Sequence, residues 1–161
     1  MSKIFWFIAT FLIMVTSAGV VFFEPRNSPV IAGKNILVNL VLNERVEQLL
    51  RNNDSSQRNG LIVLSTPNLR NLRIPSNLQG VIIKVLSQGE IDELSNVSPV
   101  DYMVFDRVEQ THAYTGVVEV TFFWGYKGVG SSWWGLNSGA TYFCSSRFGE
   151  WVITGGEFWI P

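Results

Sequence analysis

Side chains that could carry out acid–base chemistry are few in this sequence. His112 is the single histidine among 161 residues, and it stands in "THAYTG", which is typical of a turn. Catalysis there would need a carboxylate from a neighbouring strand, and two carboxylates about 5–10 Å apart could hydrolyse a glycosidic bond. The candidate carboxylates are Asp101, Asp106, Glu109 and Glu119. Because carboxylates on the open face of an antiparallel sheet are ordinary, we predict no catalytic residue. A small hydrolase or other enzyme that uses His112 with these carboxylates is the alternative.

Two arginines and two tryptophans are the residues that we predict to bind a ligand. Arg70 and Arg73 lie in "TPNLRNLRIPSNLQ", a loop with two prolines, and their guanidinium groups match a carboxylate or a phosphate. Trp133 and Trp134 lie in "VGSSWWGLNSGATYF", here called the aromatic loop. Adjacent side chains in extended backbone point to opposite sides, so we expect one ring to cover the end of the core and the other to face solvent. The exposed ring could receive a protein or a small-molecule ligand.

Metals, cofactors and nucleic acids are not expected as ligands. One cysteine, one histidine and no CxxC motif fall short of a conventional zinc site. Gly125, Gly128 and Gly130 resemble a phosphate-binding loop, but such a loop needs a following helix, and a strand is predicted here. Cys144 alternates inward in a predicted strand, where a buried thiol is a poor nucleophile. The formal net charge of −1 gives no long-range attraction for nucleic acid.

The first 23 residues are predicted to be a signal peptide or a transmembrane anchor. The run from residue 4 to residue 23 is uncharged and long enough to span a hydrocarbon core of about 30 Å as a helix. Its length favours an anchor, whereas the small residues Thr16-Ser17-Ala18 favour cleavage. Lys3 precedes the run, so the positive-inside rule leaves the N-terminus in the cytoplasm. The remainder of the chain is expected outside, either held to the membrane by residues 4–23 or, if cleaved, secreted or periplasmic.

Residues 24–35 read as a linker, and residues 36–161 as a single domain. Apolar residues recur at helical spacing after Ile36, which predicts an amphipathic helix. Short β-branched runs at 61–65 and 80–87 predict strands. Ser87 and Glu90 have the spacing of a capping box, so a short helix should follow to about Leu94. The apolar residues of the first helix are Val38, Leu42, Val46, Leu49 and Leu50.

Four further strands are predicted at 101–110, 117–124, 138–147 and 150–160. The last two are joined by Phe148-Gly149, which places Arg147 opposite Glu150 if the turn has two residues. Adjacent glycines at 155 and 156 indicate a bulge or bend. One or two helices packed on an antiparallel sheet give an α+β domain. The residues expected to face the core are Val118, Val120, Phe122 and Trp124, and then Tyr142, Cys144, Trp151 and Ile153.

The C-terminal "GEWVITGGEFWI" after a glycine-rich hairpin resembles small exported bacterial α+β domains of unknown function. Some of those domains have an NTF2-like or cystatin-like sheet. The order of elements departs from the NTF2-like pattern, in which helices come first and strands later, and no functional residue is implied. We therefore expect a non-catalytic, exported or membrane-tethered binding or accessory domain.

Overall fold

The computed structural model describes residues 29–51, 60–127 and 136–160. The predicted signal or anchor at 1–23 and the tryptophans Trp133 and Trp134 lie outside these ranges. None of the described helices has the length and apolar character needed to cross a bilayer.

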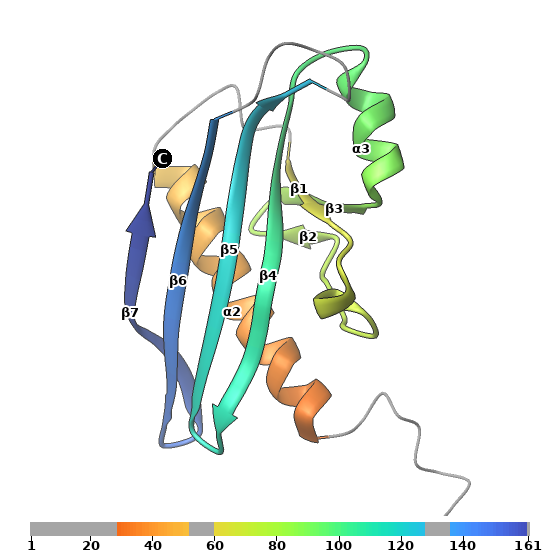
Figure 1. Cartoon of the computed structure of the whole chain (residues 1–161). Helices are drawn as coiled ribbons and strands as arrows, with labels where there is room; N and C mark the ends of the chain where they lie inside the picture. Colours follow the sequence, from red (N-terminus) through yellow and green to blue (C-terminus); the bar gives the residue numbers. More distant parts are fainter. Residues whose placement is uncertain (1–28, 52–59, 128–135, 161) are drawn as a thin grey trace, which may run out of the picture.

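The described residues form one mixed sheet of seven strands with two α-helices (Figure 1). The spatial order of the strands is β2-β3-β1-β4-β5-β6-β7. A small α+β domain was predicted, and this class is confirmed. In chain order the elements are α2 (Pro29–Arg51), β1 (Leu61–Leu64), the 3₁₀ helix η3 (Pro67–Leu69), β2 (Asn77–Leu78), β3 (Val81–Leu86), α3 (Gln88–Ser95), β4 (Val100–His112), β5 (Thr115–Tyr126), β6 (Leu136–Arg147) and β7 (Glu150–Trp159).

The sheet is not wholly antiparallel, which corrects the prediction. Strand β1 runs parallel to both of its neighbours, β3 and β4, whereas β4 to β7 form an antiparallel meander. Helix α3 carries the chain from β3 to β4, and a crossover of this kind returns the next strand in the same direction.

Helix α2 begins at Pro29, so the predicted linker at 24–35 is wrong from that residue on. Proline suits the first turn of a helix because its missing N–H has no partner there anyway. Gly33 packs against Gln110 of β4, and Leu37 packs against Gly116 of β5. The first turns of α2, part of which the sequence predicted to be a linker, are therefore held as a helix by their packing on the sheet.

One face of the sheet packs on α2 and forms the main core. The predicted inward faces are confirmed: Val118 and Val120 are buried, as are Tyr142 and Cys144, and Trp151 packs against them. Arg147 pairs with Glu150 across the two-residue turn as predicted. The register of β6 and β7 shifts at Phe143/Cys144, beside Gly155, so the expected bulge is also present.

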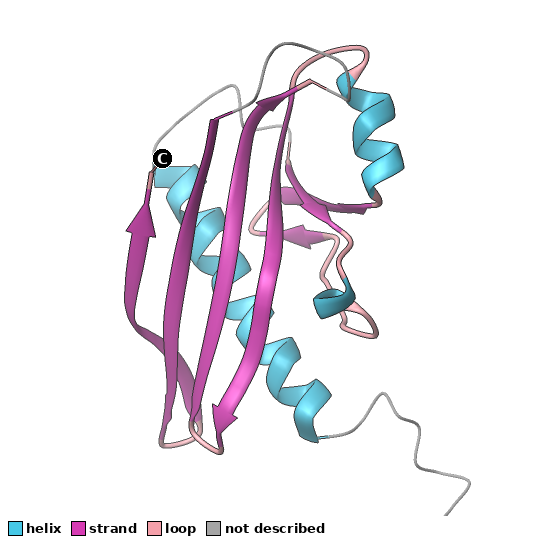
Figure 2. Ribbon diagram, in the orientation of Figure 1, coloured by secondary structure: helices cyan, strands magenta, loops and turns pink. Residues whose placement is uncertain are grey.

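Among the described elements, α3 covers the other face of the sheet, at one end (Figure 2). Ile91 of α3 is fully buried in a smaller cluster with Val100 and Tyr102. The capping box that predicted this helix is formed: the Ser87 N–H donates to the Glu90 carboxylate at 2.7 Å, and the Glu90 N–H donates to Ser87 Oγ at 3.4 Å.

Candidate functional site

A cavity of about 340 Å³ lies at the end of the sheet where β1 and β4 begin. These two strands share a single paired position, Val63 with Met103. Before that position they are not paired, and residues of both line the cavity, including Leu61 of β1 and Val100 of β4. Helix α2 closes one side with Arg45 and Leu49. The cavity thus occupies the opening between two strands that meet at one point.

Arg45 is one of three charged residues that line this cavity, together with Lys84 and Asp101. Its guanidinium carbon lies 4.9 Å from the centre of the Phe122 ring and 5.2 Å from that of Trp124. The two rings are themselves stacked, with centroids 6.0 Å apart. Cation–π contacts of this kind stabilise a cation that has lost part of its water.

Among the described residues, one side-chain hydrogen bond of Arg45 is present. One terminal nitrogen donates to Gln48 Oε1 at 3.4 Å, while the Nε–H is buried and has no partner among the described residues. No described carboxylate lies within ion-pair distance of it. Burial lowers the pKa of Arg45, although Tyr142 and Asp101 act in the opposite sense. The group remains a cation at neutral pH, since the ordinary pKa of arginine lies above about 12.

The rim of the cavity carries one charge of each sign, Asp101 and Lys84. Asp101 is exposed, and its carboxylate accepts a hydrogen bond from the Gly125 N–H at 2.6 Å. Because these two charges are of opposite sign, the positive charge of Arg45, which forms no ion pair among the described residues, dominates the interior. An anion with an apolar body fits this arrangement.

An aromatic cluster on the α3 side supports the far wall. Tyr102 lines the cavity and stacks on Phe123 at a centroid distance of 4.7 Å. Tyr126 meets Tyr102 edge-on and donates its hydroxyl to Asp92 of α3 at 2.8 Å. Burial, with Tyr126 and Asp92 nearby, raises the pKa of Tyr102 to about 12, so its hydroxyl stays neutral.

The sequence contains a signal for Arg45 in the pattern of its own helix. The apolar stripe of α2 includes Val38, Leu42 and Leu49, and Arg45 lies seven residues after Val38 on the same side of the helix. A charged residue in the middle of an apolar stripe must either be paired or face a cavity. Arg45 was therefore recognisable as an exception to its own helix pattern.

The predicted arginines lie elsewhere. Arg70 and Arg73 are both exposed, and neither lines the Arg45 cavity. The Arg73 backbone N–H donates to Asn35 Oδ1 at 2.7 Å, which ties this loop to α2. Arg73 borders a separate, shallow depression beside α2, of which Arg70 is not part.

The residues of the alternative hydrolase do not converge either. His112 is exposed at the last position of β4, and none of the described carboxylates forms an ion pair with it. Asp106 accepts a hydrogen bond from the Thr121 hydroxyl at 2.7 Å. Glu109 and Glu119 both bind Arg107, and Asp101 is at the cavity rim. In the described part of the chain, no cluster of three or more His, Cys, Asp or Glu side chains could hold a metal ion.

Trp133 and Trp134 lie in the segment that follows Tyr126 at the end of β5 and precedes Leu136 at the start of β6. The positions of Trp133 and Trp134 themselves are outside the described residues. Comparisons of the chain with protein families, with curated proteins and with solved structures find no match.

Proposed function

We propose that this chain is a non-catalytic, membrane-tethered domain that binds an anionic small molecule with an apolar body in the Arg45 cavity. The observation that carries the proposal is the half-buried guanidinium of Arg45, which lies over Phe122 and Trp124 and forms no ion pair with any carboxylate among the described residues. A ligand acceptor would bind the terminal nitrogens of the guanidinium group, because the Nε–H is shielded even from water, and a hydrogen bond from a charged donor is among the stronger ones. The tether is the uncharged run at residues 4–23.

The size and lining of the cavity agree with a small ligand. Its volume of about 340 Å³ lies in the lower part of the range of about 300–1,000 Å³ found for small-molecule sites. Leu49, Leu61 and Met103 provide apolar wall, and one charged group provides orientation. This division between an apolar lining and few polar groups is typical of binding pockets.

The hydrolase alternative receives no comparable support. Strand β4 spans 13 residues, so His112 lies about 40 Å along the strand from the cavity end, at ~3.3 Å per residue. No described carboxylate pairs with it there.

The test is calorimetric titration of the full chain in nanodiscs with phenylacetate and with its neutral analogue phenylacetamide. A charge-assisted hydrogen bond is worth about 1.5–3 kcal/mol, so phenylacetate should bind roughly 10- to 100-fold more tightly than the amide. Arg45→Met keeps an apolar chain over the rings and removes the charge. It should abolish the preference for the acid and leave amide binding unchanged.

Arg51→Met is the matched control, because Arg51 lies on the same helix, is exposed and pairs with Glu47. It should leave both affinities unchanged. Arg45→Met should not destabilise the domain, since the guanidinium group is costly to bury. A variant that unfolds would show that Arg45 is structural. A folded variant that still prefers the acid would show that Arg45 does not recognise the ligand charge. Either result would contradict the proposal.

A further inference from the structure

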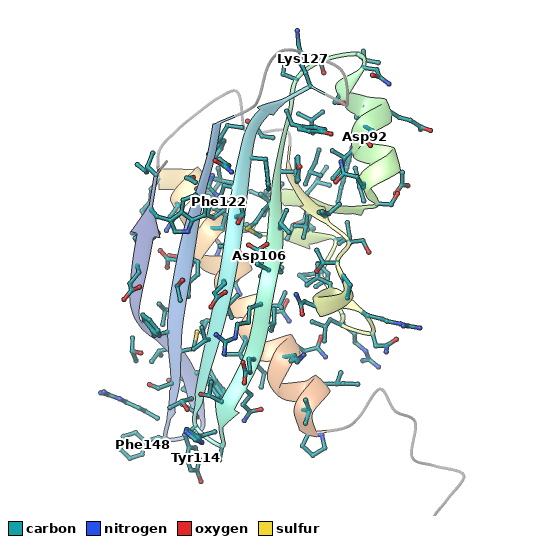
Figure 3. The ribbon with its side chains drawn as sticks, viewed as in Figure 1. Asp92, Asp106, Tyr114, Phe122, Lys127 and Phe148 are labelled. Atoms are coloured by element: carbon teal, nitrogen blue, oxygen red, sulfur yellow. The ribbon has the colours of Figure 1, made fainter. Side chains whose placement is uncertain are left out.

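The end of the sheet opposite the cavity carries two exposed aromatic side chains at its turns. Tyr114, in the turn between β4 and β5, is 69% exposed, and Phe148, between β6 and β7, is fully exposed. The Ser146 N–H donates to the Tyr114 carbonyl at 2.8 Å, so the two hairpins are joined at this end. Figure 3 shows both rings at the lower end of the sheet, away from Phe122 beside the cavity.

Phe148 is unfavourable for the isolated domain. Its φ is 53° and that of Gly149 is 86°, which together form the backbone of a tight hairpin turn with two left-handed residues. Asn, Asp or Gly normally occupies the first of these positions, and a bulky residue there is a strained exception. Because the ring is also fully exposed, the fold gains no packing from it. We therefore expect the Phe148 side chain to contact a surface outside the domain.

Helix α2 starts at the same end. Gly33 packs on Gln110 near the end of β4, and Leu37 packs on Gly116 near the start of β5. Figure 1 shows the first turns of α2 and both hairpin turns at the lower end of the molecule. Val30, in the first turn of α2, is 60% exposed. The chain that precedes Pro29 therefore joins the domain at the end that carries the exposed aromatic rings.

The chain before Pro29 limits how far this end can lie from a membrane. Residues 24–28 are five residues between the uncharged run and α2, and five residues span at most about 18 Å when extended. If the run at 4–23 lies in a bilayer, as the proposed function holds, the start of α2 is kept within that distance of its surface, and the hairpin turns are at the same end of the domain (Figure 1). Aromatic side chains are the ones that favour the membrane–water interface.

We propose that Tyr114 and Phe148 dock the hairpin end onto the bilayer that holds residues 4–23. The inference rests on the tether in the proposed function but not on ligand binding. The partner is the lipid interface itself, because Arg147 and Glu150 oppose each other beside Phe148 and leave no excess charge at that turn. In this orientation the strands β4 to β7 lead away from the membrane, and the Arg45 cavity faces the aqueous phase.

The experiment uses the full chain in phosphatidylcholine nanodiscs that contain lipids brominated in their acyl chains. An environment-sensitive nitrobenzoxadiazole label is placed at Ala113→Cys, exposed in the turn beside Tyr114, or at Glu93→Cys, exposed on α3 at the cavity end. Docking to the depth of an interfacial side chain should quench the label in the turn at least about twofold more than the label on α3. Cys144 is buried and should take no label.

The matched variant carries Tyr114→Ser and Phe148→Asn. Asparagine suits the backbone of the turn, so the melting temperature should stay the same or rise, while the excess quenching at Ala113→Cys should disappear. Equal quenching at the two labelled sites, or quenching that survives in the double variant, would overturn docking even if the chain stays with the nanodiscs. Failure of the chain to co-elute with nanodiscs would overturn the tether, and the inference with it. For a chain that does co-elute, ligand titration is interpreted independently of the quenching result.

Discussion

Arg45 of α2 and Cys144 of β6 both lie between α2 and the sheet, but their surroundings give them different properties. Arg45 borders the cavity and retains its charge, and its Nε–H is free among the described groups. Cys144 is only 2% exposed, and burial raises the pKa of its thiol from 9.0 to about 11. A thiolate is the reactive form of cysteine, so Cys144 is a packing residue at neutral pH, as its inward position in the sequence predicted.

Modification of Cys144 should therefore depend on unfolding. At pH 8 the native full chain should give no reaction with Ellman's reagent over minutes, and should give one thiol per chain in urea. Val152→Cys, placed at an exposed position of β7 in a Cys144→Ala background, is the control and should react at once. Rapid labelling of Cys144 in the native chain would mean that the sheet opens locally at β6.

The raised pKa of Cys144 also determines how the stability of the domain changes with pH. Because the folded state favours the protonated thiol, this contribution to stability is fully present below about pH 9 and is lost as the pH rises through about 11.

At the scale of elements, two glycines show how closely α2 approaches the sheet. A Cβ on Gly116 of β5 would lie 2.7 Å from Leu37, which is fully buried, and 3.1 Å from the Glu109 carbonyl oxygen. A Cβ on Gly33 of α2 would meet only the end of the Gln110 side chain, which is partly exposed and can turn away.

Gly116→Ala and Gly33→Ala should consequently have opposite effects on stability. Gly116→Ala should lower the free energy of unfolding by about 1–3 kcal/mol, because neither the packed Leu37 nor the backbone can yield freely. Gly33→Ala should be neutral or stabilising by up to about 1 kcal/mol, because alanine is the better helix former. Urea denaturation of both variants measures this difference. A Gly33→Ala variant that is the more destabilised of the two would show that the Gln110 contact, and not Leu37, fixes the helix.

The accuracy of the sequence predictions differed between local and long-range features. The Ser87 capping box, the Phe148-Gly149 turn and the inward faces of the long strands depend on residues near one another in the chain, and these predictions are confirmed. The position of β1 between β3 and β4 was missed, since the choice of a distant partner strand depends on packing of the whole sheet. The start of α2 at Pro29 was missed for the same reason.

At the candidate site, the sequence predicted Arg70 and Arg73 from their residue type alone. Arg45 was not predicted, although it interrupts an apolar stripe.

At the scale of the whole molecule, we propose ligand binding at one end of the long strands and membrane docking at the other. One end holds the cavity with Arg45, and the other holds the aromatic turns at Tyr114 and Phe148. The strand β4 runs between them over about 40 Å, at ~3.3 Å per residue. A domain docked by its turns would thus take up its ligand from the aqueous side and not from the lipid.

The single paired position between β1 and β4 has a kinetic consequence. The turns of the β4–β5 and β6–β7 hairpins have two residues each, whereas Val63 and Met103 are brought together from positions about forty residues apart. Contacts between residues distant in sequence form late and slow the folding of a chain. The meander should therefore form first, and β1 with β3 should join it last.

In native hydrogen exchange, amides of β1 and β3 should exchange at least about tenfold faster than central amides of β5 and β6, since the last part to fold is commonly the first to open. Equal rates in all four strands would show that the sheet opens as one unit. Because the Arg45 cavity lies between β1 and β4, a ligand bound there should slow exchange in β1 and β3 more than in the meander. The binding site would then also hold together the two parts of the fold.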